Sequence, residues 1–175
     1  MNITLIGMSG VGKSTIGKAL AKRLGYTFID VDSVIKEKAG MPLQMLIDTQ
    51  GDSVLVRLEE EAVLGLELKE GCIISPGGSV IYSEEAMTFL KKKSTIVFLD
   101  MSLKNIIKRV KNPGNRGIVG FHEKSMKEIY EERFTLYKRY SDITIKLRGG
   151  EKNAMVVDSI LELLEEYRNS IEKFI

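Results

Sequence analysis

The sequence predicts an α/β fold in which a five-stranded parallel sheet is covered by helices on both faces. Short apolar runs typical of strands recur along the chain, and they alternate with segments that have helical spacing or a helix-start signal. This alternation is typical of parallel strands joined by crossover helices. The 175 residues, 43% hydrophobic and 29% charged, suffice for a single domain, residues 1–175, with a buried core.

Five short runs are predicted as strands, and the segments between them as helices. The predicted strands are residues 3–6, 26–29, 72–74, 95–99 and 143–145. One helix is expected from about Lys13 to Leu24, and others are expected to begin after Ser83, which precedes two glutamates, and after Ser102. The C-terminal segment is predicted to be a helix that packs on the domain through Val156, Val157, Ile160, Leu163 and Leu164.

Composition argues against several kinds of partner. The 26 Lys and Arg residues are interleaved with 24 Asp and Glu residues and form no polybasic block, so nucleic acid is not expected. No apolar stretch approaches the roughly 18 residues of a membrane helix, and the apolar run at residues 1–7 breaks into glycines before a signal-peptide core could form. The single cysteine, Cys72, cannot form an internal disulfide and is expected to be buried. We expect a cytoplasmic monomer without a nucleic-acid or membrane partner.

A phosphate-binding loop follows the first predicted strand. Residues 7–14 read Gly-Met-Ser-Gly-Val-Gly-Lys-Ser, which matches G-x-x-x-x-G-K-[ST] between a strand and a helix. The glycines let backbone N–H groups turn toward phosphate oxygens, and the helix start adds its positive end. Lys13 is expected to reach the β- and γ-phosphates and Ser14 to coordinate Mg²⁺. The predicted nucleotide-binding residues of this loop are Gly10, Val11, Gly12, Lys13, Ser14 and Thr15.

Residues after two later strands point to an acceptor site. Asp30 and Asp32 close the second strand, and the two-residue period of a strand predicts both carboxylates on one side of it. One would support Mg²⁺ and the other would accept a hydrogen bond from a substrate hydroxyl; alternatively, Asp32 caps a helix that begins near residue 33. Gly77 and Gly78 follow the third strand and either let a ligand approach the backbone closely or form a plain turn. Ligands bind at the carboxyl ends of such strands, so these residues are expected to share one site.

A mobile lid is predicted over about residues 112–123. This stretch carries Pro113, Gly114, Gly117 and Gly120 and shows no periodicity. Loops of this kind close over phosphates and exclude water. Arg116 within it is expected to stabilise charge on the transferring phosphoryl group. His122, near the end of the lid, is expected to be exposed and without a role.

Taken as a whole, the chain resembles the shikimate kinase family over nearly its full length. The resemblance rests on the phosphate loop, Phe-Ile-Asp-Val-Asp at 28–32, Gly-Asp at 51–52, the start of the helix that carries Arg57, Pro-Gly-Gly at 76–78, Asn-Arg-Gly at 115–117 and Glu-Arg-Phe-Thr-Leu-Tyr at 132–137. It implies a three-layer P-loop kinase fold that uses ATP and Mg²⁺ to phosphorylate the hydroxyl of a small acid. For most of the family this reaction converts shikimate to shikimate 3-phosphate, in aromatic amino acid biosynthesis.

The resemblance also implies roles for single residues. Asp30 would support the metal, and Asp32 would hold the acceptor hydroxyl. Gly77 and Gly78 would contact the acceptor, whose carboxylate Arg133 would bind. Arg116 would reach over the transferred phosphate. Arg109 and Arg148 would stack on the adenine of the nucleotide.

The chain departs from the family pattern on the acceptor side. The family usually has F-R-x-x-E after Gly-Asp, with the arginine on the substrate carboxylate. Without a gap, Val56 takes that position, whereas a one-residue slip puts Arg57 there, about 100° away around the helix. Arg57 is therefore either a substrate-binding residue or a solvent-facing one. The gapless alignment is favoured by the apolar positions Leu58, Ala62, Val63 and Leu66. Pro76 replaces a glycine and has no N–H to offer.

Two classes of function remain open at this point. The first is an ATP-dependent kinase in which Lys13, Asp32 and Arg116 are catalytic and the acceptor is shikimate or another small acid such as homoserine. The second is a nucleotide-binding regulatory module without kinase activity. The lid arginine and the paired aspartates favour the kinase, because a module that only binds nucleotide needs neither. An Asn-Lys-x-Asp guanine-reading motif is missing, which disfavours a GTPase.

Overall fold

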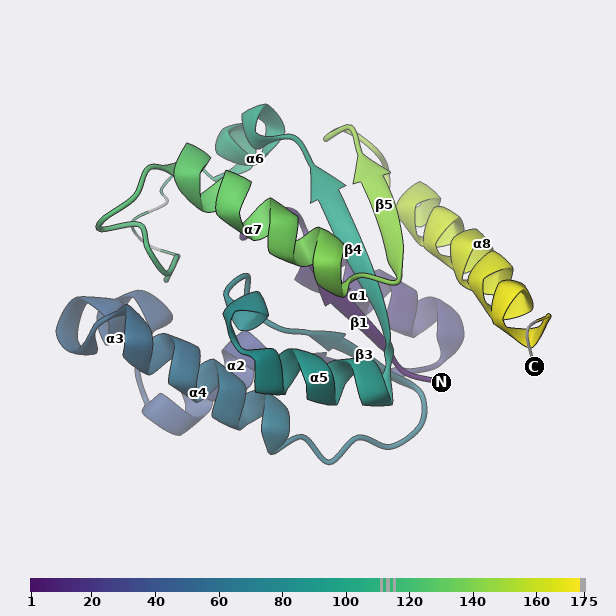
Figure 1. The fold of residues 1–175 in the computed structure, drawn as a ribbon, viewed down its shortest axis with the longest axis horizontal. Helices are drawn as coiled ribbons and strands as arrows, with labels where there is room; N and C mark the ends of the chain where they lie inside the picture. Colours follow the sequence, from purple (N-terminus) through teal and green to yellow (C-terminus); the bar gives the residue numbers. More distant parts are fainter. Residues whose placement is uncertain (111, 113, 115, 174–175) are drawn as a thin grey trace.

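The computed structural model describes residues 1–110, 112, 114 and 116–173, and within them five strands form one parallel sheet. Pro113 of the predicted lid and Asn115 of the family motif lie outside the described residues. The strands are β1 (Ile3–Ile6), β2 (Thr27–Asp30), β3 (Cys72–Ser75), β4 (Thr95–Met101) and β5 (Ile143–Leu147), in the order β2-β3-β1-β4-β5 (Figure 1). All five predicted strands are confirmed, the first with identical bounds and the others with bounds that differ by one or two residues.

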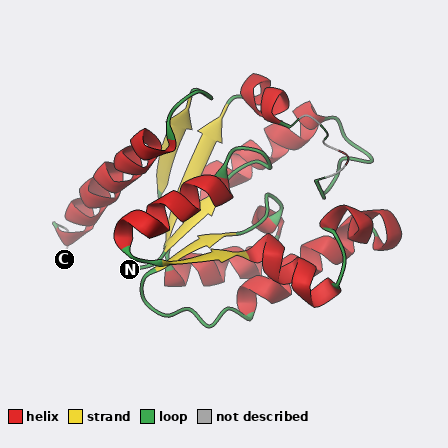
Figure 2. Cartoon of the chain, turned by 180° about the vertical axis from the view of Figure 1, so that it is seen from behind, coloured by secondary structure: helices red, strands yellow, loops and turns green. Residues whose placement is uncertain are grey.

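The sheet is the middle of three layers. Its helices are α1 (Lys13–Leu24), α2 (Val31–Ala39), α3 (Leu43–Gln50), α4 (Asp52–Leu64), α5 (Glu84–Lys93), α6 (Leu103–Arg109), α7 (Met126–Tyr140) and α8 (Asn153–Glu172), with a short 3-10 turn, η1 (Val80–Tyr82). Helices α5 and α7 pack on β4 from the front in Figure 1, whereas α1 and α8 cover the other face, which Figure 2 shows from behind. Helices α2, α3 and α4 pack against one another. The predicted α/β fold with both faces covered is therefore confirmed.

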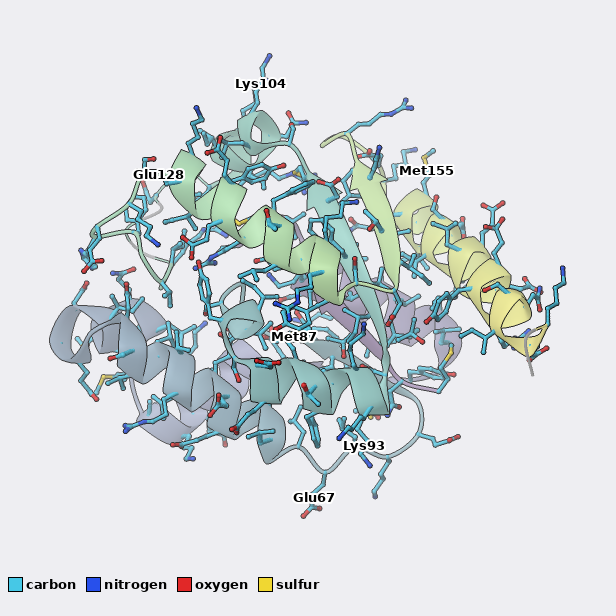
Figure 3. The ribbon with its side chains drawn as sticks, in the orientation of Figure 1. Glu67, Met87, Lys93, Lys104, Glu128 and Met155 are labelled. Carbon is cyan, nitrogen blue, oxygen red and sulfur yellow. The ribbon has the colours of Figure 1, made fainter. Side chains whose placement is uncertain are left out.

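The core lies between the sheet and these helices. All four residues of the central strand β1 are buried, as a strand covered on both faces requires. Met87 of α5 is fully buried in the middle of the molecule, whereas Met155, at the start of α8, is exposed on the outside (Figure 3). Cys72 is buried, as expected. Helix α8 buries Val156, Val157, Ile160 and Leu164, but Leu163 is only partly buried.

The helix starts show where local sequence signals succeed and fail. The Ser83 hydroxyl accepts the backbone N–H of Ala86 at 3.0 Å and caps α5, as predicted. Ser102 stands at the start of α6 but makes no side-chain capping bond. The strand-to-helix junction falls inside the aspartate pair, because β2 ends at Asp30 and α2 begins at Val31. The prediction that both carboxylates project from one side of a strand is therefore wrong, since Asp32 lies in the first turn of α2.

Within the described part of the chain, no helix combines the length and the apolar character needed to cross a membrane.

Candidate active site

The phosphate loop has a conformation that only glycine adopts easily at three positions. Gly7, Gly10 and Gly12 have φ angles of 146°, 87° and 109°, between the end of β1 and the start of α1. At Gly10 a Cβ atom would also lie 2.3 Å from a methyl carbon of Val110, so there is no space for a side chain. The loop therefore depends on glycine for its backbone angles and, at Gly10, for its packing.

Lys13 is the first residue of α1, and its side chain binds back to this loop. Its side chain is buried, and its Nζ donates to the carbonyl oxygens of Gly7 at 2.8 Å and of Met8 at 3.4 Å. Burial lowers the pKa of Lys13, while the carboxylates of Asp32 and Glu59 act in the opposite direction. The ammonium group is therefore close enough to both acceptor-side carboxylates to interact with them electrostatically.

A cavity of about 430 Å³, here called the nucleotide cavity, opens beside the loop. Its lining residues are Ser9, Gly10, Gly12, Lys13, Ser14, Thr15, Asp32, Ser75, Pro76, Gly78, Arg109 and Arg116. The structure thus brings together the three residues predicted to be catalytic and most of the predicted nucleotide-binding residues. Val11 is the exception in the loop, because its side chain is fully buried in the core.

The two arginines expected at the adenine are placed differently. Arg109, the last residue of α6, lines the nucleotide cavity and donates to the carbonyl oxygens of Val11 at 3.0 Å and Gly149 at 3.2 Å. Arg148 is exposed and does not line the cavity. The carboxylate of Glu151 accepts hydrogen bonds from the backbone N–H groups of Arg148 and Gly149. Arg109 is therefore positioned for the predicted contact, and the side chain of Arg148 is not.

A second, much smaller cavity of about 20 Å³, here called the acceptor cavity, adjoins the first. Its lining residues are Ser9, Asp32, Ile35, Leu43, Leu55, Glu59, Gly77, Gly78, Ser79, Arg116, Gly117, Ile118 and Arg133. Asp32 and Arg116 line both cavities. Burial raises the pKa of Asp32, and the positive charge of Lys13 opposes this effect. A carboxylate with these properties, between the two cavities, is suited to receive a proton from a hydroxyl.

Gly77 and Gly78 are needed for space in the wall of the acceptor cavity. A Cβ at Gly77 would lie 2.5 Å from Oε1 of Glu59 and 2.9 Å from Oδ1 of Asp32. A Cβ at Gly78 would lie 2.9 Å from a guanidinium nitrogen of Arg133. Neither glycine has a positive φ angle, so close approach alone explains the residue type. The interpretation of these glycines as a plain turn is therefore disfavoured.

Arg133 reaches the acceptor cavity from the middle of α7. Its side chain is 1% exposed, and it donates to the carbonyl oxygen of Val119 at 2.8 Å and to the hydroxyl of Tyr82 at 3.3 Å. The guanidinium also lies over the Tyr82 ring, 5.3 Å from its centre. The nearby hydroxyl of Tyr137 donates to the carbonyl oxygen of Gly78 at 2.6 Å. A buried cation with a fixed orientation is therefore available for an anionic group of a ligand.

The sequence prediction missed Glu59, a buried carboxylate in the acceptor cavity. Its Oε2 accepts the Ser79 hydroxyl at 2.5 Å, and its Oε1 has no hydrogen-bond partner among the described residues. Burial raises the pKa of Glu59 to about 7. The helical spacing could have predicted the burial of Glu59, because this residue shares the buried face of α4 with Leu55, Ala62 and Val63. Leu58 and Leu66, which were predicted on that face, are only partly buried.

The structure does not bring Arg57 to either cavity. Its side chain is exposed, and its Nε lies 3.8 Å from Oε1 of Glu61, one turn along α4. The substrate-binding prediction for Arg57 is therefore wrong, since the residue faces solvent. Val56 is half-buried one turn before Glu59, which fits the gapless alignment.

Residues 116–123, which belong to the predicted lid of residues 112–123, form turns that are attached to α3 and α4. The backbone N–H of Gly117 donates to the side-chain oxygen of Gln44 at 2.9 Å, and that of Gly120 donates to Asp52 at 2.6 Å. Ile118, within this segment, is buried. His122 is exposed, as expected, and its Nε2 lies 3.3 Å from Oδ1 of Asp48. These contacts hold Arg116 and its neighbours over the acceptor cavity.

The predicted Mg²⁺ ligands are an alcohol and a carboxylate. Ser14 lines the nucleotide cavity, and Asp30, the last residue of β2, is half-buried and close enough to raise the pKa of Asp32. Among the described residues, no group of three or more His, Cys, Asp or Glu side chains could hold a metal ion. Oxygen donors of this kind fit Mg²⁺, which keeps several waters and binds through one or two carboxylates together with substrate phosphates.

A parallel α/β sheet with a phosphate loop at the start of α1, a carboxylate and a lid arginine beside it, defines a P-loop phosphotransferase that acts on a small alcohol. The family model described as "Shikimate kinase" matches residues 9–165. The chain belongs to the shikimate kinase family.

Individual relatives agree with this assignment. The chain is 34% identical to the shikimate kinase of Aquifex aeolicus over 165 residues, which cover 94% of this chain and 96% of the relative. The crystal structure of that enzyme superposes with a TM-score of 0.81 and covers 94% of this chain and 96% of the other. A shikimate kinase from Acinetobacter baumannii in complex with shikimate is 25% identical, with a TM-score of 0.85 and coverage of 94% and 93%.

Proposed function

We propose that this protein is an ATP-dependent kinase that phosphorylates a ring hydroxyl of shikimate to give shikimate 3-phosphate, a step of aromatic amino acid biosynthesis. The observation that carries the proposal is the position of Asp32 and Arg116, which line both the nucleotide cavity and the acceptor cavity. A hydroxyl bound at Asp32 is therefore next to the place where Lys13 would hold the γ-phosphate. The cytoplasm is the proposed compartment, since its reducing conditions suit the free thiol of Cys72.

In the proposed reaction the protein positions its substrates and neutralises charge. Asp32 accepts the hydrogen bond of the attacking hydroxyl and takes its proton as the oxygen–phosphorus bond forms and ADP leaves. Lys13 and Arg116 stabilise the negative charge on the transferring group. Ser14 and Asp30 would hold Mg²⁺, which supplies further charge neutralisation at the phosphates when bound. Arg133 binds the acceptor carboxylate.

Access to the acceptor cavity requires movement of the lid. A cavity of about 20 Å³ holds about one water molecule, so a ring-sized acid cannot enter while Gly117 lies against Leu43. We infer that the segment opens to admit the acceptor and closes before transfer, which excludes water from the γ-phosphate. The hydrogen bonds to Gln44 and Asp52 are then contacts of the closed form.

The test is a coupled ADP-release assay with ATP and Mg²⁺, with and without shikimate. Acceptor-stimulated turnover is expected, and it should be lost in Lys13→Ala, because this change removes the positive charge that Lys13 brings to the β- and γ-phosphates. Circular dichroism and thermal unfolding of the purified variants serve as the control for folding. Nucleotide binding without turnover on any acceptor would favour the regulatory module, and turnover by Lys13→Ala would contradict the mechanism.

A further inference from the structure

Tyr82 contacts the guanidinium of Arg133 in two ways. Its hydroxyl accepts the Nε–H of Arg133 at 3.3 Å, and its ring centre lies 5.3 Å from the guanidinium carbon. Tyr82 is the last residue of η1, which packs against α7, the helix that carries Arg133. A hydrogen bond and a cation–π contact from one side chain therefore hold the Nε side of this buried cation.

The other anchor of Arg133 belongs to the lid. Its Nη2 donates to the carbonyl oxygen of Val119 at 2.8 Å, and Val119 lies within the predicted lid of residues 112–123. That bond exists only while the segment is closed, whereas Tyr82 lies outside the lid and stays with the body of the protein. In an open form, the contacts with Tyr82 are therefore the ones that keep the guanidinium in place.

The Tyr82 hydroxyl is itself fixed by a second partner. A hydrogen bond from Lys124 at 2.6 Å lowers the pKa of Glu132, burial opposes this effect, and a hydrogen bond from the Tyr82 hydroxyl lowers the pKa further. A phenol has one hydrogen to donate and lone pairs with which to accept. Tyr82 thus donates to Glu132 and accepts from Arg133, which leaves its hydroxyl one orientation.

These anchors determine which part of the guanidinium meets a ligand. Of its three nitrogens, Nε is engaged by Tyr82 and Nη2 by Val119. Nη1 lies beside Gly78, where a Cβ atom would be only 2.9 Å from it, and Gly78 lines both cavities. Nη1, with two N–H donors, is therefore the nitrogen that faces the site.

We propose that Tyr82 is a positioning residue, which holds Arg133 by its Nε–H so that the carboxylate of the acceptor is bound through Nη1. This inference rests on the proposed function, because Arg133 is the residue that binds the acceptor carboxylate there. Since Tyr82 does not depend on the lid, the acceptor meets a cation that is already oriented when it enters the open site. The lid bond to Val119 is then added on closure.

Two acceptors and two matched variants test the inference. The acceptors are shikimate and its carboxamide, which lacks the negative charge that Arg133 binds. Tyr82→Phe removes the hydroxyl and keeps the ring. Tyr26→Phe makes the same change at another half-buried tyrosine, which lines neither cavity. ADP release gives kcat and KM for each acceptor and for ATP, and the inhibition constant against shikimate replaces KM if the carboxamide is turned over too slowly. Thermal unfolding checks that both variants are folded.

The effect of Tyr82→Phe should depend on the charge of the acceptor. The KM for shikimate is expected to rise roughly tenfold, whereas the constant for the carboxamide should change less than about twofold. The values of kcat and of KM for ATP should stay close to those of the wild type, because the bond to the carboxylate is made before and during transfer alike. Tyr26→Phe should change none of these values.

A measurement on the wild type alone gives a second, independent readout. The Nε–H of Arg133 is observed by ¹⁵N NMR and assigned by its absence from Arg133→Lys. It should exchange slowly with solvent before any ligand is added, and addition of shikimate should leave it slow and little shifted, because the carboxylate binds at Nη1.

Either of two results would overturn the inference and leave the proposed function intact. The first is an equal loss of affinity for both acceptors in folded Tyr82→Phe, which would indicate general damage to the site. The second is an Nε–H that exchanges rapidly in the free protein or shifts strongly with shikimate, which would place the carboxylate on Nε. Absence of shikimate turnover in the wild type would overturn the proposed function, and this inference with it.

Discussion

Replacement of Gly77 by alanine should damage the acceptor cavity and leave the nucleotide cavity intact. The new methyl carbon would lie 2.5 Å from Oε1 of Glu59 and 2.9 Å from Oδ1 of Asp32, both shorter than a van der Waals contact. Both carboxylates are held in place, one by Ser79 and the other at the start of α2, so the clash moves at least one of them. Overpacking of this kind costs about 1–3 kcal/mol.

If that free energy is lost from acceptor binding, kcat/KM for the acceptor falls roughly 5- to 150-fold at about 1.4 kcal/mol per tenfold change. The assay is ADP release at saturating ATP, with KM for the acceptor and affinity for ATP measured separately. Gly150→Ala is the matched control, since nothing lies within 4 Å of a Cβ there. A folded Gly77→Ala variant whose acceptor KM changes less than twofold would refute the assigned role of Gly77.

Three further changes test other parts of the site. Because the pKa of Glu59 is about 7 in the folded protein and 4.5 ordinarily, the folded state binds more protons between these values, and the free energy of unfolding should fall as pH rises from 4.5 to 7, by up to roughly 3 kcal/mol. Glu59→Gln should flatten that slope in urea unfolding, and an unchanged slope would contradict the burial argument. Val56→Arg adds a cation one turn from Glu59 and should lower the shikimate KM roughly tenfold, and an unchanged KM would contradict the placement of position 56 beside the acceptor cavity. Asp52→Ala removes the acceptor of the Gly120 N–H and should raise acceptor KM, whereas a variant with normal KM would show that this bond does not hold the lid closed.

The fold and the nucleotide side could be predicted from the sequence because local signals determine them. A buried strand followed by a glycine-rich turn and a helix fixes Lys13 and Ser14 within a few residues of chain. Continuous apolar runs such as residues 3–6 identify the interior strands of a parallel sheet. The expected lid position also follows from composition alone, although its mobility and the monomeric state of the protein stay predictions.

The acceptor side was harder to predict because it is assembled from distant segments. Glu59 meets Ser79 and Gly77 only after α4 packs against the chain that follows β3, and no local pattern gives that contact. Arg57 was misleading, since a one-residue difference on a helix separates a solvent-facing side chain from one that enters the cavity. Asp32 lies in the expected site, but the first turn of α2 positions it there and not the end of β2. The strand ends two residues earlier than the two-residue period of the prediction assumes.

Arg116 belongs to the walls of both cavities, and this dual position links the two ligands thermodynamically. If one ligand favours the arrangement in which Arg116 and Gly117 are docked on α3, this segment is already ordered when the other ligand binds. The second ligand then pays a smaller entropic cost. The affinity for ATP should then rise in the presence of the acceptor by the same factor as the affinity for the acceptor rises in the presence of the nucleotide, because such coupling is reciprocal. The segment that closes the site would thus make each substrate an activator of binding for the other.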